Sequence, residues 1–204
     1  MFDNAKSGVQ HIIPFQTNFK MFKHLSVSVG GQYSETWTGK TIRYNDFNEG
    51  VGAVKDTISG FDRFGVYNYN ASITTKVYGI INFKPKNKVQ SIRHTISPSI
   101  SYSNNPSFEK YYDTYIIDAN GNTAEYTRFQ GGLYNAPGRN YSSSIGLTIK
   151  NVIEAKVKPK DSTETELRKI DIFKNLNIST SYNIAAEEFN FCLLYTSPAH
   201  ETWS

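Results

Sequence analysis

Apolar and polar side chains alternate along residues 89–103, and this pattern recurs through much of the chain. One set of alternate positions is mainly apolar or aromatic, and the other holds small hydroxyl side chains with one arginine. The first set is Ile92, His94, Ile96, Pro98, Ile100 and Tyr102, and the second is Ser91, Arg93, Thr95, Ser97, Ser99 and Ser101. Because successive side chains of a β-strand project to opposite faces, this pattern predicts a strand with an apolar wall and a polar wall.

Further segments alternate in the same way, and they are residues 8–22, 25–34, 64–83, 141–157 and 170–185. The polar positions of the fourth segment include Lys150 and Glu154. Connections after Phe22 and Phe83 are short and polar, which favours antiparallel neighbours. We therefore predict an all-β fold, an antiparallel up-and-down meander of about six long strands.

The predicted connections alternate in length along the chain. The periodicity fails over residues 37–62 and 104–138, which we predict to be long loops, whereas the connections after Phe22 and Phe83 are brief. An antiparallel meander places every second connection at the same end. Outer-membrane barrels have this asymmetry, with short periplasmic turns at one end and longer outer loops at the other.

Strand length and aromatic placement also favour a membrane protein. Several predicted strands exceed the roughly 9 to 11 residues that a tilted membrane strand needs. Aromatic residues near the strand ends fit two interfacial girdles, with Tyr33, Trp37, Tyr67, Tyr69, Tyr102 and Tyr141 toward the long loops and Phe19, Phe22 and Phe83 toward the short turns. We expect the apolar wall to face lipid and the polar wall to line a wet lumen. Six strands are too few to close such a barrel, so the chain is predicted to be an incomplete arc of a larger barrel in the cell outer membrane.

Composition argues against several other classes of protein. The net charge of +4 is modest and the 22 lysines and arginines are scattered along the sequence, which argues against nucleic-acid binding. A single cysteine, Cys192, excludes an intrachain disulfide and a cysteine-based zinc site. His11, His24 and His94 have no partner at metal-ligand spacing, and no Gly-x-Ser-x-Gly motif is present. We therefore expect neither an enzyme nor a cofactor or metal site.

One loop segment imitates the start of a calcium-binding loop. Asp118, Asn120 and Asn122 have the required spacing, but Gly121 comes two positions too early for the EF-hand turn and no bidentate glutamate follows at the right place. We predict an ordinary Asn-Gly turn instead.

The end of the chain differs from the rest. The hexapeptide CLLYTS at residues 192–197 back-translates to TGTCTCTTATACACATCT, the mosaic end of a transposon sequencing adapter, and PAHET fits the continuation of that adapter after a one-base slip. We therefore expect two parts: residues 1–191, a partial outer-membrane barrel, and residues 192–204, a non-native tail. On this interpretation the chain is an internal fragment of a longer protein.

Three stretches resemble the LptD family of lipopolysaccharide-assembly barrels. The segment HTISPSISY at residues 94–102, followed by Asn105, Pro106 and Phe108, is similar to the family's strand-and-loop signature, in which Thr-Leu-x-Pro leads to an aromatic strand end and then a proline. Here Ile96 replaces the leucine and Ser99 the usual arginine. Residues 8–29 and 174–189 resemble a more divergent branch of the family.

The resemblance implies a function and a set of partners. Such a barrel receives lipopolysaccharide from a periplasmic bridge, works with a plug lipoprotein, and releases its substrate into the outer leaflet by lateral opening between membrane lipids. The bridge would dock through an N-terminal domain that is not recognisable in this sequence. The gate strands are not recognisable either, so the resemblance assigns no mechanistic residue.

The residues themselves suggest a substrate path. Its candidate lumen-facing residues are Ser91, Arg93, Thr95, Ser97, Ser99, Ser101, Lys150 and Glu154. Arg93 either contacts a phosphorylated headgroup or pairs with an acid such as Glu154. Pro98 lacks a backbone donor, so it either weakens strand pairing or shapes a bulge. Two other functions stay open, another outer-membrane barrel (a porin or an uptake receptor) and a secreted β-rich adhesion or carbohydrate-binding module.

Overall fold

The computed structural model describes residues 6–159 and 166–196. Its strands are β1 (Gly8–Met21), β2 (Leu25–Tyr44), β3 (Lys55–Thr74), β4 (Val77–Asn82), β5 (Val89–Asn105), β6 (Tyr112–Ile116), β7 (Thr123–Thr127), β8 (Ser142–Val157), β9 (Arg168–Asn183) and β10 (Phe191–Thr196). A short 3₁₀-helix, η1 (Glu109–Tyr111), precedes β6. The described chain is therefore almost entirely β-structure.

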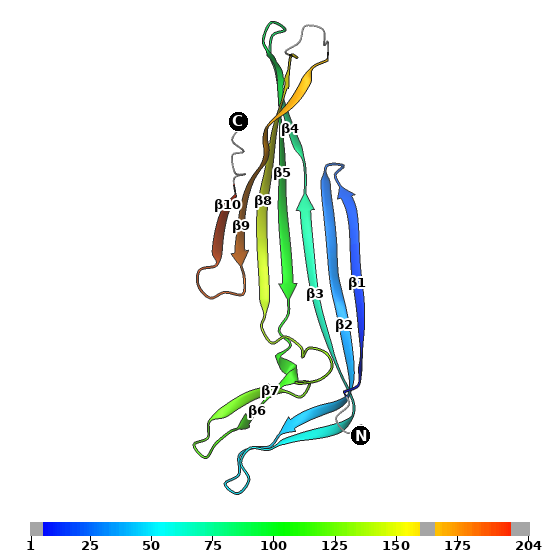
Figure 1. Cartoon of the computed structure of the whole chain (residues 1–204), viewed down its shortest axis with the longest axis vertical. Helices are drawn as coiled ribbons and strands as arrows, with labels where there is room; N and C mark the ends of the chain where they lie inside the picture. The colour runs from blue at the N-terminus through cyan, green and yellow to red at the C-terminus, as the bar shows by residue number, and fades with distance from the viewer. Residues whose placement is uncertain (1–5, 160–165, 197–204) are drawn as a thin grey trace. The chain divides into compact units, whose positions relative to one another are not determined.

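Eight of these strands form one sheet in the order β1-β2-β3-β5-β8-β9-β10, with β4 pairing with β5 as well (Figure 1). Its six long strands have 14 to 20 residues each. Within the described residues the sheet is open, with β1 and β10 at its edges. The predicted fold class, an antiparallel meander that forms an incomplete barrel arc, is confirmed.

The chain divides into two compact units, and most long strands contribute residues to both. Unit 1 comprises Met1–Gln16, Gly30–Tyr69 and Asn104–Ser143, and unit 2 comprises Thr17–Val29, Asn70–Ser103 and Ser144–Ser204. Each unit is described separately below.

In unit 1, the predicted loop over residues 37–62 is wrong. β2 continues to Tyr44 and β3 begins at Lys55, so that only residues 45–54 connect the two strands. Residues 104–143 contact this extension of the β2–β3 hairpin through aromatic side chains and backbone hydrogen bonds. Its two faces therefore need not differ in polarity, and the sequence lacks alternation here. Ile42 N–H, for example, donates to the Arg128 carbonyl at 2.9 Å, and Phe47 N–H donates to that of Ile116.

The second predicted loop, residues 104–138, also contains regular structure. η1, β6 and β7 lie within it, and β6 pairs antiparallel with β7. Phe64 of β3 packs against Phe129 with ring centroids 4.7 Å apart, and both side chains are 4% exposed. Tyr111 contacts both rings. We call this group, with its supporting hairpins, the aromatic cap of unit 1.

The Asn-Gly turn predicted at residues 118–122 is confirmed. Asp118 accepts hydrogen bonds from the backbone N–H of Asn120 and Asn122 and from the Asn122 side chain, and Gly121 has φ +80°. These donors, chiefly the Asn122 side chain, lower the pKa of the Asp118 carboxyl. The carboxylate is thus occupied by its own loop.

In unit 2, the predicted strand over residues 64–83 is split into β3 and β4 at Thr75 and Lys76. The register across β4 and β5 runs from Val77 opposite Ile96 to Asn82 opposite Ser91. β8 pairs with β9 from Ser144 opposite Asn183 to Val157 opposite Arg168, with two register shifts between Asn151 and Glu154.

The segment predicted to be non-native begins within a described strand. β10 pairs antiparallel with β9, with Phe191 opposite Tyr182 and Thr196 opposite Asn177. Residues 197–204 lie outside the described residues, as do residues 160–165 between β8 and β9. The non-native origin of residues 192–204 stays a prediction.

Candidate functional site

The polar walls of β5, β8 and β9 share one face of unit 2. Arg93 of β5 donates from Nε to Glu154 Oε2 of β8 at 2.7 Å, and a Cβ added at Gly146 would lie 2.8 Å from Ser101 Oγ. Farther along, the hydroxyls of Thr148 and Ser179 lie 3.3 Å apart. The three strands therefore present one continuous polar surface.

Glu154 is the centre of an ionic cluster on this surface. A second Arg93 nitrogen and the Lys169 ammonium both contact its carboxylate, and its side chain is only 11% exposed, whereas both cations are about half-exposed. Asp171 lies directly opposite Glu154 in the β8–β9 register, and Lys156 lies opposite Lys169. Three cations and two acids thus occupy neighbouring positions of β5, β8 and β9, with Glu154 in contact with Arg93 and Lys169.

A hollow of about 510 Å³ opens beside this cluster. Its lining comes from four strands and consists of Ile80, Asn82, Ser91, Arg93, Glu154, Ala155, Lys156 and Lys169. Asn82 lies opposite Ser91 and Ile80 opposite Arg93 in the β4–β5 register, which places these four side chains on the polar face. Six of the eight lining residues are polar or charged, and the cations among them outnumber the one acid.

The structure brings the predicted lumen-facing residues onto this one surface. Ser91, Arg93, Thr95, Ser97, Ser99 and Ser101 alternate along β5, and Lys150 and Glu154 lie on the corresponding face of β8. Ser99 accepts a hydrogen bond from Thr74 Oγ1 at 2.9 Å, and Lys150 lies opposite Asn177. Of the two roles considered for Arg93, pairing with Glu154 is the one present. A role of these residues in a substrate path stays a prediction.

Pro98 lies on an interior strand, at the level where β3 and β4 are separated. Thr75 N–H donates to the Pro98 carbonyl at 3.2 Å, but Pro98 has no N–H to return to the Thr75 carbonyl. The register is the same on both sides, because Val77 lies opposite Ile96 while the side chain of Thr74 meets that of Ser99. The proline therefore interrupts the ladder without a bulge. Whether the interruption favours opening stays a prediction.

Replacement of Pro98 by alanine is expected to close this gap. The new N–H can donate to the Thr75 carbonyl, and this hydrogen bond should stabilise the folded state by about 1 kcal/mol. Loss of the proline also gives the unfolded chain more conformational entropy, which should lower the free energy of unfolding by about 0.4–1 kcal/mol. Overall stability should change little, but the amide at position 98 should be protected in hydrogen exchange. Ser97→Ala is the matched control and should leave the exchange at Thr75 and Val77 as it is. An unprotected amide at position 98 would contradict the assignment.

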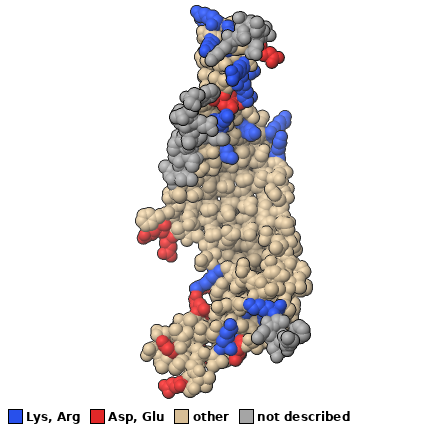
Figure 2. All heavy atoms as spheres, viewed as in Figure 1, with Lys and Arg blue, Asp and Glu red and all other residues tan. Residues whose placement is uncertain are grey.

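The apolar wall of unit 2 remains exposed. Ile81 is 61% exposed, Ile100 55% and Ile145 43%, although all three occupy regular strands. Thus the described part of the chain does not bury this wall in a two-sheet core, as a soluble sandwich would. In the view of Figure 2, charged side chains lie mainly near turns and strand ends. An exposed apolar wall on regular strands is typical of strands that contact lipid.

Two aromatic residues of β2 in unit 1, Tyr33 and Trp37, have hydrogen-bonded polar tips and exposed rings. Tyr33 OH and Trp37 Nε1 each donate to the Glu35 carboxylate at 2.7 Å, and Arg63 pairs with the same group at 2.9 Å. Both rings are more than one-third exposed. Tyr and Trp with a satisfied polar tip and an exposed ring fit the border between lipid and water.

A comparison with protein families identifies the chain. The model of the family described as LptD protein matches residues 1–199. The chain belongs to the LptD family. No curated protein and no solved structure matches it. Membership, together with the all-β fold, supports involvement in lipopolysaccharide transport and assembly, and LptD proteins are outer-membrane proteins.

Two properties of the described residues complete this picture of the family member. No helix among them has both the length and the apolar character to span a membrane. Within residues 6–159 and 166–196, no three or more His, Cys, Asp or Glu side chains are grouped so that they could hold a metal ion.

Lys169 is the site residue that sequence analysis missed. It falls between the strands predicted over residues 141–157 and 170–185, whereas the structure places it in β9, opposite Lys156 and in contact with Glu154. The alternation of Lys169 with Asp171 was the available signal. It was obscured because β9 contains the extra residues of both register shifts, so that its alternation is broken near Phe173.

Proposed function

We propose that this chain forms part of the wall of the outer-membrane translocon that inserts lipopolysaccharide into the outer leaflet. The observation that carries the proposal is the presence of an exposed apolar wall and a polar, ion-bearing wall on opposite faces of the same long strands. An arc of this kind separates lipid from a wet passage, and membership of the LptD family supplies the substrate class.

The polar wall suits an amphiphile with a phosphorylated sugar headgroup. Hydroxyl side chains along β5 and the hydroxyls of a sugar both form hydrogen bonds with water. Replacing these with hydrogen bonds to each other therefore costs little free energy, and the sugar can move along the wall. At the end beside the β4–β5 turn, Arg93, Lys156 and Lys169 outnumber Glu154 and Asp171, which favours an anionic group. We infer that the headgroup travels along this surface.

The partners proposed for the chain follow from this role. A plug lipoprotein would occupy the lumen beside the polar wall, and a periplasmic bridge would deliver the lipopolysaccharide through an N-terminal docking domain. Membrane lipid would cover the apolar wall. No enzymatic step is proposed, because transfer from bridge to leaflet requires no covalent change in the substrate.

Photo-crosslinking from two neighbouring positions tests the proposal. Benzoylphenylalanine at Ser91 would project from the polar wall, and at Ile92 it would project from the apolar wall at the same depth. In the full-length protein in growing cells, we expect crosslinks to lipopolysaccharide from Ser91 and crosslinks to phospholipid from Ile92. The pair lies beside the short β4–β5 turn, the end proposed to be periplasmic, where the adjacent leaflet holds phospholipid.

Depletion of cellular energy is the control for transport. Crosslinks from Ser91 should fall severalfold when delivery stops, while those from Ile92 should stay constant. Equal labelling of lipopolysaccharide from both positions, or none from Ser91 in a folded protein, would refute the assignment of the polar wall to the substrate path.

A further inference from the structure

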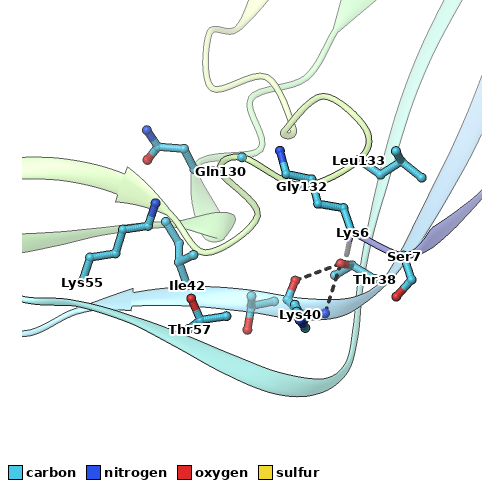
Figure 3. A pocket seen from close by; sticks show the side chains of 12 residues that line it. Lys6, Ser7, Thr38, Lys40, Ile42, Lys55, Thr57, Gln130, Gly132 and Leu133 are labelled. Atoms are coloured by element: carbon cyan, nitrogen blue, oxygen red, sulfur yellow. Dashed lines mark hydrogen bonds between the residues drawn. The ribbon is translucent and has the colours of Figure 1, made fainter. Parts of the chain in front are cut away.

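A second hollow lies in unit 1, apart from the polar wall described above. It has a volume of about 200 Å³ and is enclosed by the start of the described chain, the adjacent parts of β2 and β3, and the turn that follows β7 (Figure 3). The residues that line it are Lys6, Ser7, Thr38, Lys40, Thr41, Ile42, Lys55, Thr57, Gln130, Gly131, Gly132 and Leu133. We call it the lysine pocket.

The lysine pocket is strongly cationic for its size. Lys6, Lys40 and Lys55 come from three separate segments, and none of the twelve described residues that line the pocket is acidic. In Figure 3 the ends of Lys6 and Lys55 extend toward the turn at Gln130–Gly132. Three lysines in the lining of one small hollow, with no acid among the described residues that line it, favour an anion with several charged oxygens.

Hydroxyl side chains accompany these lysines. Ser7, Thr38, Thr41 and Thr57 line the same space. The Thr38 hydroxyl donates to the Lys40 carbonyl, and the hydroxyls of Ser7, Thr41 and Thr57 can donate to an oxygen acceptor. A phosphate has three terminal oxygens that can accept several such bonds at once, and a sugar attached to it adds further hydroxyls. The lining therefore suits a sugar phosphate better than a carboxylate or an apolar group.

The pocket walls are held in place by the surrounding backbone. Gly39 N–H donates to the Ser7 carbonyl at 3.4 Å, and Thr38 Oγ1 donates to the Lys40 carbonyl at 2.8 Å. On the opposite side, Gln130 N–H donates to the Thr127 carbonyl at 2.9 Å, and Gly131 has φ +73°, a conformation that glycine adopts without strain. The backbone segments that bear the lining residues are thus held by hydrogen bonds of their own.

We propose that the lysine pocket binds a phosphate group of a phosphorylated saccharide. At roughly 30 Å³ per water molecule, the pocket has room for about seven waters, which suits a phosphate with part of one sugar ring. The identification of that saccharide with the headgroup of lipopolysaccharide rests on the function proposed above. The anion site itself rests only on the residues of unit 1.

Titration of the full chain in phosphatidylcholine nanodiscs tests the site. The probes are glucosamine 1-phosphate, inorganic phosphate and N-acetylglucosamine, and calorimetry gives the dissociation constants. We expect glucosamine 1-phosphate to bind, inorganic phosphate to bind at least threefold more weakly, and N-acetylglucosamine not to bind. Affinity for the phosphosugar should fall as salt is added, because the contacts are ionic and partly exposed to water.

Two triple variants separate the pocket from general charge. K6Q/K40Q/K55Q removes the three pocket cations and should weaken phosphosugar binding at least tenfold. K84Q/K86Q/K88Q removes three lysines from the β4–β5 turn of unit 2 and should leave the affinity within twofold. The variant K6R/K40R/K55R retains the charges and should bind within about threefold of the original chain. Far-UV circular dichroism checks that each variant keeps its strands.

Each outcome bears on the proposal. Equal weakening in both glutamine variants, or no phosphosugar binding by the original chain, would overturn the pocket. Equal affinity for inorganic phosphate and the phosphosugar would overturn the saccharide assignment in favour of free phosphate. Nanodiscs that contain lipid A should compete with the soluble phosphosugar, and dephosphorylated lipid A should not. Loss of the Ser91 crosslink with normal titrations would refute the transport path and leave the pocket standing.

Discussion

Replacement of Phe129 by alanine should destabilise the aromatic cap of unit 1 by about 3 kcal/mol, the largest effect expected here. The Phe129 ring is almost fully buried against Phe64 and Tyr111, and Arg128 lies over its face at 4.7 Å. Alanine would leave a cavity beside Phe64 and Tyr111. Because these contacts join residues 104–143 to β3, the segment should open far more often.

Limited proteolysis and hydrogen exchange measure this opening. Cleavage within residues 104–143 should accelerate by roughly a hundredfold if cleavage follows the open population, since 1.4 kcal/mol corresponds to tenfold. Phe22→Ala is the matched control, because Phe22 is 79% exposed in the β1–β2 turn and its loss should change stability by less than about 0.5 kcal/mol. Unchanged exchange in the Phe129 variant would show that the cap does not depend on this ring.

Replacement of Gly31 by valine should destabilise unit 1 by about 1–3 kcal/mol. A Cβ at this position would lie 2.5 Å from Phe15 Cζ and nearer still to the Asn68 backbone oxygen. The Phe15 ring can rotate away, but the carbonyl of Asn68 belongs to the neighbouring strand β3 and moves only if the strands separate. Glycine is therefore required here because the Asn68 backbone and the Phe15 ring lie so close to its Cα, and not because of its φ, which is outside the left-handed range.

A glycine in an open part of the sheet provides the control for this substitution. A Cβ added at Gly79 of β4 would meet only the His94 carbonyl oxygen, at 4.0 Å, so Gly79→Val should be tolerated. Unfolding in urea, followed by the gel mobility of the unheated protein, gives the urea midpoint of the Gly31→Val variant and that of the Gly79→Val variant. Adding Phe15→Ala to the Gly31 variant should restore only part of the loss, because the contact with Asn68 remains. Full rescue would show that the ring alone requires the glycine.

Alternation along single strands was the reliable signal in this sequence. It located β1, β5, β8 and most of β9, and it separated Ser91 and Arg93 from Ile92 and His94 on opposite walls. It failed where side chains on both faces of a strand contact other parts of the chain, as at residues 37–44 of β2. There Ile42 is buried while its backbone bonds to Arg128, so neither face has to be polar or lipid-exposed.

The candidate site was only partly accessible to sequence reasoning. The Arg93–Glu154 pair was one of two alternatives considered, and the structure shows it, with Lys169 as an additional partner. Arg93 and Glu154 are 61 positions apart in the sequence, and they come into contact only because of how β5 is aligned with β8. Likewise, the lysines appeared scattered along the sequence, yet three of them line one pocket.

The sequence by itself determined the two-walled strands, the antiparallel meander and the resemblance to the LptD family, because a period of two and a strand-and-loop motif are local properties of the chain. Only the tertiary structure decided that the supposed loops form an aromatic cap, that Pro98 interrupts a ladder at unchanged register, and that Lys6, Lys40 and Lys55 line one pocket. These depend on which distant backbone groups pair and on the alignment of that pairing. Local alternation does not encode either one.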